Sequence, residues 1–202
     1  MSNKITTRHA RRIVAAVFST ALLTAVVPAV AGAACSSSAT SEPFAKFGDT
    51  AAYAPLAGGS FESGAPGWSL SNSTVVSGNE SYNVAGGSHS LAIQPTGVAV
   101  SPTFCVNTAE PSFRFFLRQT SGSWAVLNVV LRWTDSSGTS HDTTVGSLQT
   151  GTAWQASPVL QLATTLPLTT SSSSISAKLV FKPEQYGGAW AIDDVYVDPH
   201  SR

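Results

Sequence analysis

The sequence predicts an all-β protein that folds as a single antiparallel β-sandwich behind a cleaved N-terminal signal segment. Short runs of β-prone residues alternate with clusters of Gly, Ser, Pro and Asn, which is the pattern of a sandwich or barrel. No segment beyond the N-terminal region has a sustained helical stripe with capping residues. Charged residues make up only 11% of the chain, whereas Ser, Thr, Gly and Val are abundant, as in extracellular β proteins.

Segment 1–34 has the three parts of a signal peptide. An apolar stretch over residues 13–30 leads into the small-residue motif Ala31-Gly32-Ala33, and it follows the basic residues Lys4, Arg8, Arg11 and Arg12. The apolar stretch is interrupted by polar residues and ends without a charged stop, so a membrane anchor fits less well. The arginine pair raises a twin-arginine route, but its surroundings fit that motif poorly. We expect a secreted protein with no stable membrane span after cleavage.

Cys35 directly follows the cleavage region, and two interpretations of it stay open. Cleavage after Ala33 or Ala34 leaves it free to form a disulfide with Cys105, the other cysteine of the chain. The bridge would close a loop of about seventy residues, worth roughly 4 kcal/mol in the chain-entropy model. Alternatively, Cys35 is lipidated and anchors a cell-surface lipoprotein, although Gly32 stands where such signals have an aliphatic residue. We favour the disulfide.

Removal of the signal segment leaves a mildly acidic chain. Seven basic and eleven acidic residues remain, a net charge of −4 before the histidines are counted. A nucleic-acid partner would require a basic surface, so the charge argues against that class of partner. About 168 residues remain, enough for one domain with its own core, and we expect a monomer.

The mature chain is expected to be one domain with two terminal extensions. Residues 35–57 are expected to form an arm with little regular structure, residues 58–198 the sandwich, and residues 199–202 a tail. The Thr/Ser-rich stretch 164–174 is typical of a surface loop. Strands are expected near residues 67–70, 73–77, 89–94, 97–100, 103–106, 112–118, 124–134, 140–147, 157–162, 174–182 and 189–197.

Alternation of side chains in three strands predicts the face that meets the core. The apolar positions are Phe113, Phe115 and Leu117 in the first strand, Ala125, Leu127, Val129, Leu131 and Trp133 in the second, and Ile175, Ala177, Leu179 and Phe181 in the third. The polar connection 119–123 between the first two strands predicts a hairpin.

The opposite face of the same strands gathers basic residues. These are Arg114, Arg118, Arg132, Lys178 and Lys182, five of the seven that remain after cleavage. If the strands share a sheet, its outer face is basic and also presents Phe116 and Asn128. Such a face suits a ligand with carboxylate, phosphate or sulfate groups. The alternative is an ordinary solvated face, because outward positions of a strand are polar anyway.

Three motifs of the domain occur in the same order in one family. The segment 58–64, Gly-Gly-Ser-Phe-Glu-Ser-Gly, followed by Gly67-Trp68, resembles the opening of many carbohydrate-binding modules. Ser90-Leu91-Ala92-Ile93 is similar to their Ser-Leu strand, and residues 190–197 are similar to their closing aromatic-x-Ile-Asp-Asp-Val strand. Over residues 58–198 the chain therefore resembles the galactose-binding-like jelly rolls. It also looks like a group of exported actinobacterial proteins.

This resemblance implies a structural calcium ion where the first and last strands meet. Carried across, Glu62 and Asp194 are the expected ligands, with Asp193 and a carbonyl near Ser60 as further candidates. Calcium takes several oxygen ligands, and one ion here would close a long loop of chain. Alternation places Asp194 on the same side as Ile192. The alternative is a solvated strand end at the aspartates and a turn capped by Glu62, and Glu80 could also serve the site.

The resemblance also implies glycan binding, usually on an aromatic platform. Candidate platforms are Trp124, Trp154, Tyr82 and Tyr186, whereas Trp68, Trp133 and Trp190 are expected in the core. The candidate ligand-binding residues are therefore Arg114, Phe116, Arg118, Trp124, Asn128, Arg132 and Lys178.

The predicted function is that of a secreted, non-catalytic domain that binds an acidic or cell-wall glycan. The sequence has no Gly-x-Ser-x-Gly elbow, His-Glu-x-x-His motif, phosphate loop or zinc-spaced cluster, and we expect no catalytic residue. A structural or adhesive protein-interaction domain with a large flat apolar patch is the alternative. A polysaccharide hydrolase with paired carboxylates in a deep cleft is a less favoured one.

Overall fold

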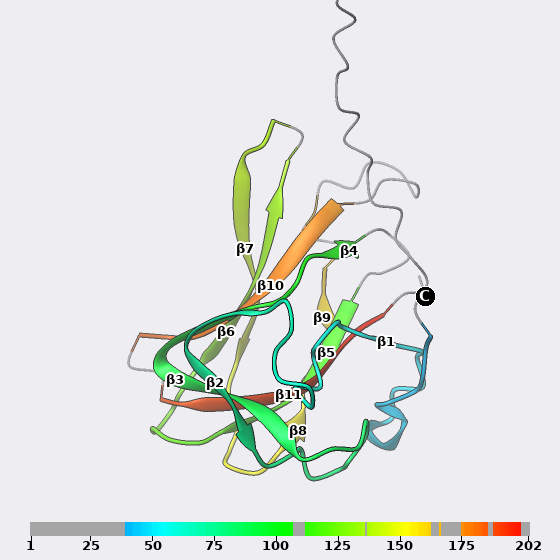
Figure 1. Ribbon diagram of the computed structural model, residues 1–202, viewed down its shortest axis with the longest axis vertical. Helices are drawn as coiled ribbons and strands as arrows, with labels where there is room; N and C mark the ends of the chain where they lie inside the picture. The colour runs from blue at the N-terminus through cyan, green and yellow to red at the C-terminus, as the bar shows by residue number, and fades with distance from the viewer. Residues whose placement is uncertain are drawn as a thin grey trace, which may run out of the picture. The chain divides into compact units, whose positions relative to one another are not determined.

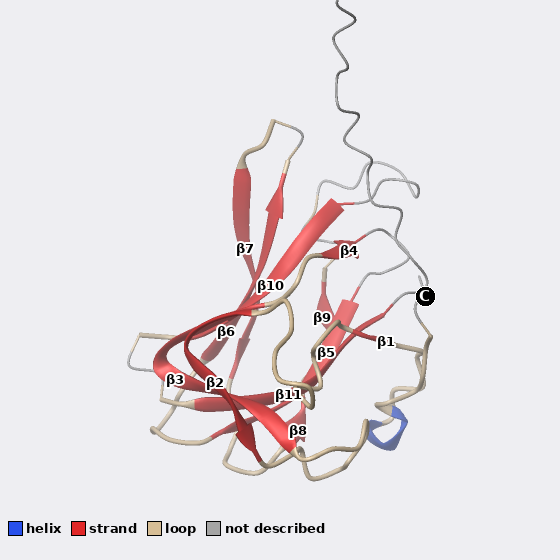
Figure 2. Ribbon diagram, in the orientation of Figure 1, coloured by secondary structure: helices blue, strands red, loops and turns tan. Residues whose placement is uncertain are grey.

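Short antiparallel strands build almost all of the regular structure (Figures 1 and 2). The computed structural model describes residues 39–106, 112–135, 137–162, 166, 175–185 and 188–198, all within one unit. The elements are η1 (Ala45–Phe47), β1 (Ala54–Pro55), β2 (Ser69–Ser77), β3 (His89–Val100), β4 (Phe104–Val106), β5 (Ser112–Gln119), β6 (Leu127–Thr134), β7 (Ser140–Leu148), β8 (Gln155–Ala156), β9 (Leu160–Gln161), β10 (Ile175–Pro183) and β11 (Trp190–Asp198). None of the described segments is a helix long and apolar enough to cross a membrane.

The strands form one curled antiparallel sheet that folds back on itself. Its order is β7-β6-β10-β3-β11-β5-β8, while β2 pairs with β3, β4 with β10, β1 with β11 and β9 with β5. The long strand β3 joins the two layers, because residues 91–93 pair with β11 and residues 99–100 pair with β10. The predicted all-β sandwich is confirmed. The predicted signal segment 1–34 and tail 199–202 lie outside the described residues, as does most of the Thr/Ser-rich stretch 164–174.

The core lies between the two layers, where alternation predicted it. Most of the expected apolar positions of β5, β6 and β10 belong to one buried cluster that also contains Trp190 and Ile192 of β11, and Trp133 and Ile175 pack against it half-buried. Phe115 of β5 meets Phe181 of β10 across the layers with ring centroids 5.0 Å apart. Trp68 and Trp190 are buried as expected, while Trp133 is half-buried. Burial of these large side chains is the main favourable term that holds the layers together.

The predicted hairpin between β5 and β6 is wrong. β5 pairs with β11, β8 and β9, whereas β6 pairs with β10 and β7. Both strands direct their apolar side chains into the same core from opposite layers, and the connection 120–126 crosses between the layers. Alternation predicts which face of a strand is buried, but it is silent on which strands are neighbours.

β11 is irregular between Asp193 and Tyr196, where its register with β5 shifts. Asp194 has a positive φ of 47° at this irregularity. The extra residue breaks the alternation, so Val195 rather than Asp194 follows Ile192 into the core. The expectation that Asp194 lies on the same side as Ile192 was therefore based on a regular strand that the chain does not form.

The N-terminal arm is more ordered than predicted. Residues 39–55 contain η1, β1 and an isolated bridge between Ser41 and Tyr53. Phe44 and Tyr53 of the arm are fully buried in a second cluster with Phe116, Trp154, Ala191 and Tyr196. This cluster lies on the side of β5 and β11 that faces away from the main core. The arm therefore covers the outer face of this layer.

Candidate functional site

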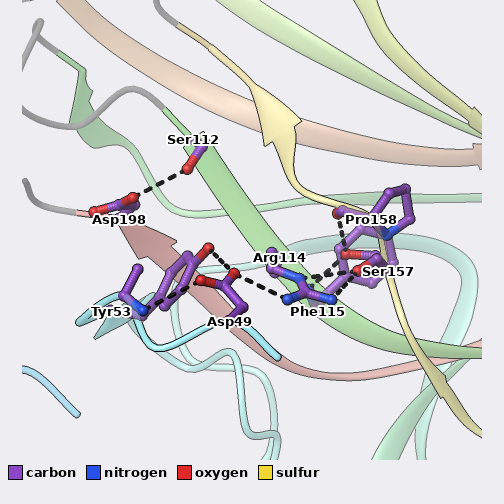
Figure 3. A network of polar contacts seen from close by, with 9 residues as sticks. Asp49, Tyr53, Ser112, Arg114, Phe115, Ser157, Pro158 and Asp198 are labelled. Atoms are coloured by element: carbon purple, nitrogen blue, oxygen red, sulfur yellow. Dashed lines mark hydrogen bonds and ion pairs between the residues drawn. The ribbon is translucent and has the colours of Figure 1, made fainter. Parts of the chain in front are cut away.

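The outer face of β5 is closed by the arm. Arg114 donates from Nη1 to Asp49 Oδ2 at 2.9 Å and from Nη2 to the Ser157 carbonyl at 2.6 Å. Its guanidinium also lies 4.4 Å from the centre of the Phe44 ring. Figure 3 shows Asp49 between Arg114 and Tyr53, whose hydroxyl donates to the same carboxylate at 2.7 Å. Arg114 is a structural residue here, because it is buried and holds the arm to β5.

Phe116 and Arg118 are likewise committed to the fold. Phe116 is fully buried and stacks on Phe44 with ring centroids 5.3 Å apart. Arg118 lies over the Trp154 ring at 5.0 Å, and Trp154 itself is only 7% exposed. Tyr82 is half-buried and donates its hydroxyl to the Trp154 carbonyl at 3.0 Å. Trp154 and Tyr82 are therefore not exposed platforms, and Tyr186 lies outside the described residues.

The predicted basic face does not exist as one surface. Strands β3 and β11 separate β5 from β10 and β6 in the sheet. Arg114, Phe116 and Arg118 therefore lie on the covered layer, whereas Asn128, Arg132 and Lys178 lie on the other layer. The prediction of one shared basic face was wrong, because strand order depends on contacts far apart in the sequence. Alternation within a strand does not report these contacts.

The outer face of β6 and β10 keeps the remaining polar candidates together. Arg132 is paired in register with Lys178, and Asn128 with Lys182. Between these two rows lies the cross-strand pair Val130 and Val180. Both lysines and Arg132 are exposed, so this face presents three cations.

Contacts with β7 orient two of these side chains. Arg132 forms a bidentate ion pair with Asp142, with both donor–acceptor distances at 2.7 Å. The Ser147 hydroxyl donates to Asn128 Oδ1 at 2.7 Å, which leaves the amide nitrogen of Asn128 pointing away from this bond. Neither lysine forms an ion pair within the described residues. Both lysine side chains are exposed on this face, and the charge of Lys182 helps to lower the pKa of Asp142.

A groove of about 510 Å³ adjoins this face. Its walls are the bend of β3 at residues 95–98, Asn128 of β6, and residues 182–185 at the end of β10. A smaller hollow of about 230 Å³ lies at the other end of the face, beside Arg132, Trp133 and Lys178. The outer face of β6 and β10 therefore has one hollow at each end, with the Asn128 amide and Lys182 beside the first and Arg132 and Lys178 beside the second.

A separate group of four carboxylates holds the loop between β2 and β3. Glu80 accepts hydrogen bonds from the backbone N–H of Tyr82 and Val84. Asp193 accepts from Glu80 N at 3.0 Å, and Asp194 accepts from Ala85 N at 3.2 Å. Glu62 accepts from the backbone N–H of the loop end, at 2.9 Å from Ser88 and 2.7 Å from His89. The sequence offered Glu80 only as an extra candidate, although it is central to this arrangement.

Strands β1 and β11 meet beside this group. β1 pairs with the end of β11, and Val195 N donates to the Gly59 carbonyl at 3.1 Å. Gly87 has a φ of 122°, and a β-carbon there would collide with the Glu62 carboxylate. Glycine at this position allows the loop backbone to lie against the carboxylate.

The surroundings of Asp193 and Asp194 disfavour the charged form of both carboxylates. Asp193 and Asp194 are almost fully buried, and desolvation raises their pKa values to about 8 and about 7. The neighbouring Asp194 carboxylate adds to the effect on Asp193, and Glu80 and Glu62 add to that on Asp194. The pKa of Tyr196 is raised to about 12, first by burial and then by the same carboxylates. A cation bound here would relieve this repulsion.

The donor set fits calcium in part. Asp194 Oδ1 is buried and has no hydrogen-bond partner among the described residues. The side-chain atoms of the group that could ligate a metal are all carboxylate oxygens, which calcium prefers. No three acidic, His or Cys side chains of the described residues already converge at metal-ligand spacing. Carboxylate oxygens that accept an N–H retain a second lone pair for a cation. Glu62, Asp193 and Asp194 are the residues that would hold the ion.

Two further candidates remain. Trp124 is 89% exposed, and its role in ligand binding stays a prediction. Cys105 lies on β4, and Cys35 lies outside the described residues, so the disulfide between them stays a prediction.

Comparisons with known proteins identify the fold but no sequence family. No protein-family model matches the chain, and no curated protein matches it. The CBM22-1 xylan-binding domain from Paenibacillus barcinonensis Xyn10C aligns over 69% of this chain and 90% of its own length, with a TM-score of 0.50 and 15% identity.

Two further solved structures are similar at lower scores. The C-terminal family 22 module of Clostridium thermocellum Xyn10B covers 73% of this chain and 96% of its own, with a TM-score of 0.48 and 14% identity. TmCBM61, solved in complex with β-1,4-galactotriose, covers 70% and 95%, with a TM-score of 0.41 and 18% identity. The similarity to exported actinobacterial proteins stays a prediction. The chain has the jelly-roll fold of carbohydrate-binding modules.

Proposed function

We propose that the protein binds glycan chains reversibly, and without catalysis, on the outer face of β6 and β10. The observation that supports this most is the groove of about 510 Å³ beside Asn128 and Lys182, on the face that also presents Lys178 and Arg132. Ligand sites are concave and orient the ligand with a small number of placed polar or charged groups. The fold shared with a xylan-binding domain is consistent with this role.

An acidic glycan suits this face better than a neutral one. Lys178 and Lys182 point outward without an ion-pair partner among the described residues, while the mature chain is acidic overall. A uronate or sulfate group would neutralise these charges through charge-assisted hydrogen bonds. The exposed large hydrophobic side chains of the described residues amount to Trp124 alone, so nothing here favours the apolar-patch alternative.

The test is a glycan array that pairs neutral chains with uronate-containing and sulfated chains. The double variant Lys178→Ala/Lys182→Ala should lose acidic ligands, whereas Lys46→Ala, an exposed lysine on η1, should bind like the wild type. Added salt should weaken the acidic ligands selectively. A folded wild-type protein that retains no glycan would overturn the proposal.

We also propose a structural calcium ion at the carboxylate group, held by Glu62, Asp193 and Asp194. The ion would supply positive charge where two buried aspartates have raised pKa values. It would stabilise the loop that these carboxylates already hold and would take no part in chemistry. Its test is the calcium dependence of stability given in the Discussion.

Finally, we propose that the protein acts outside the cell, as the signal-like segment 1–34 and the sparse charge suggest. Mass spectrometry of the exported protein distinguishes the two states of Cys35. A mature chain that starts at or just before an unmodified Cys35 supports secretion with a disulfide, and a diacylglyceryl mass on Cys35 supports the lipoprotein.

A further inference from the structure

Two charges of opposite sign line the groove of about 510 Å³. Lys182 is the last but one residue of β10, and Glu184 follows this strand directly. Both side chains are exposed, and neither forms an ion pair within the described residues. The charges that line the groove therefore cancel, although the face as a whole presents three cations.

The backbone fixes Glu184 at the wall of the groove. Pro183 precedes it, is buried, and has a ring that restricts its own φ. Glu184 N donates to the Val126 carbonyl at 2.8 Å, directly before β6 begins at Leu127. The carboxylate is therefore carried by a backbone that is tied to β6, and a ligand in the groove lies beside it.

The charged residues that line the hollow of about 230 Å³, at the other end of the face, are both cations. They are Arg132 and Lys178, which lie opposite each other on β6 and β10. Asp142 accepts from Nε and Nη2 of Arg132, so Nη1 keeps its donors free of any partner among the described residues. Nη1 and the Lys178 ammonium group can together bind a carboxylate or a sulfate group.

A row without polar side chains separates the two ends of the face. Val130 and Val180 form this row, and both are buried. Lys178 and Lys182 are four residues apart in one extended strand, so about 13 Å of strand lies between the hollow and the groove. A ligand that occupies both ends is therefore an oligomer, and its two ends meet different charges.

The groove wall suits a neutral sugar residue better than an acidic one. A carboxylate only accepts hydrogen bonds, so Glu184 can bind sugar hydroxyl groups but repels a uronate or a sulfate. Asn128 and Gln185 add amide groups that both donate and accept. A like charge placed against the wrong ligand is a general way to obtain specificity.

We propose that Glu184 restricts the groove to neutral sugar residues, while Arg132 and Lys178 bind an acidic group of the same chain about 13 Å away. The inference rests on the proposed glycan-binding function and names its ligand as a glycan whose acidic groups are spaced by neutral residues. A uniformly acidic chain would place one of its charges against Glu184. A neutral chain would leave both cations of the hollow without an anion.

The test is calorimetry with homogalacturonan oligomers of one length, in which none, about half or all of the carboxyl groups are methyl-esterified. The three probes share one backbone, and the wild type should bind the half-esterified chain most tightly. Glu184→Gln should raise the affinity for the fully acidic chain about fivefold and change that for the half-esterified chain by less than about twofold. Glu42→Gln, which neutralises an exposed carboxylate of the arm, is the matched control.

The double variant Arg132→Ala/Lys178→Ala tests the other end of the face. It should bind the half-esterified chain no more tightly than the fully esterified one, because the hollow has lost its cations. A double variant that keeps the wild-type preference for the half-esterified chain would show that the acidic group is not bound there, and the inference would be wrong. Unchanged melting of each variant excludes unfolding as the cause of a loss.

The outcomes also separate this inference from the function on which it rests. A wild type that binds the fully acidic chain as tightly as the half-esterified one overturns the inference and leaves glycan binding intact. A Glu184→Gln variant with wild-type affinities for all three chains does the same, as does a wild type that retains array glycans but none of the three chains. A folded wild type that retains no glycan at all overturns the proposed function itself.

Discussion

Arg114 of β5 and Asp49 of the N-terminal arm form an ion pair of 2.9 Å in which the two side chains are only 8% and 10% exposed. The guanidinium is shared with the Ser157 carbonyl, and the carboxylate also accepts from Tyr53. The pair joins the arm, β5 and the segment after β8. Residues 39–55 are therefore an integral part of the fold, and the outer face of β5 is not available to a ligand.

Replacement of Asp49 should be strongly destabilising. Asp49→Ala leaves the buried Arg114 charge without its partner, so we expect the free energy of unfolding to fall by about 3 kcal/mol. Urea denaturation measures it. Glu42→Ala, which removes an exposed carboxylate of the same arm, should change stability by less than about 0.5 kcal/mol. Equal and small effects of both changes would show that the arm is not docked as described.

Arg132 and Arg114 should respond in opposite ways. Arg132→Ala removes a 43% exposed side chain from the proposed glycan face, so it should weaken retention of an acidic polysaccharide in affinity electrophoresis and change melting little. Arg114→Ala should lower the melting temperature because it empties a buried site. If Arg132→Ala is retained like Lys46→Ala, Arg132 plays no part in binding.

Stability in the presence of a chelator should fall as the pH rises. Asp193 keeps its proton in the folded state up to a pKa of about 8, whereas in the unfolded state it loses the proton near pH 3.8. The free energy of unfolding therefore decreases as the pH rises from about 4 to about 8. Thermal melts from pH 4 to pH 8 should show this slope. Hydrogen bonds lower the pKa values of Asp135 and Asp142, so these two groups titrate below the window.

Asp193→Asn is the control for the pH series. The amide has nearly the same shape and no charge to desolvate, so its melting temperature should depend less on pH over the same range. Wild-type stability that rises with pH in chelator would contradict the raised pKa.

Calcium should raise the melting temperature of the wild type. An ion at one hundred times its dissociation constant adds about 2.7 kcal/mol to the free energy of unfolding. Glu62→Ala and Asp194→Ala should each abolish the response, whereas Asp142→Ala, an acidic residue on β7, should keep it. A wild type that melts identically with calcium and with chelator would end the metal proposal.

Trp124→Gly should melt at a temperature equal to or above that of Trp124→Ala. Both variants lose the indole, but only glycine adopts a φ of 58° without steric cost. The difference expected is up to about 1 kcal/mol. A glycine variant clearly less stable than the alanine variant would show that the backbone does not adopt the left-handed conformation at this position.

Local sequence patterns predicted most strands and the buried face of β5, β6 and β10, because alternation depends only on neighbours within a strand. They did not predict that β5 and β6 lie in different layers, since that order depends on contacts made by β11 and β3. The carboxylates at both ends of the domain were found from their motifs. The shift at Asp194 was not, because nothing in the residues 193–196 marks an irregular strand.

The largest error was the prediction that the outer face of β5 is open to a ligand. The sequence contained a sign that the arm is packed. Phe44, Phe47 and Tyr53 are three aromatic residues in a short segment that was expected to be irregular. Large aromatic side chains at that density are seldom left in water, so they indicated a packed arm. They do not indicate which face of the sheet the arm covers, because that depends on contacts far apart in the sequence.

The pairing of β1 with β11 also determines how the molecule would respond to mechanical load. The two strands are antiparallel, with Ala54 opposite Val197, so the chain enters and leaves at the same end of the pair. A force pulling residue 39 away from Asp198 would load these hydrogen bonds one after another, as a zipper opens. The β1–β11 pair would therefore open from this end, and the buried contacts of Phe44, Tyr53 and Asp49 would carry the load after it.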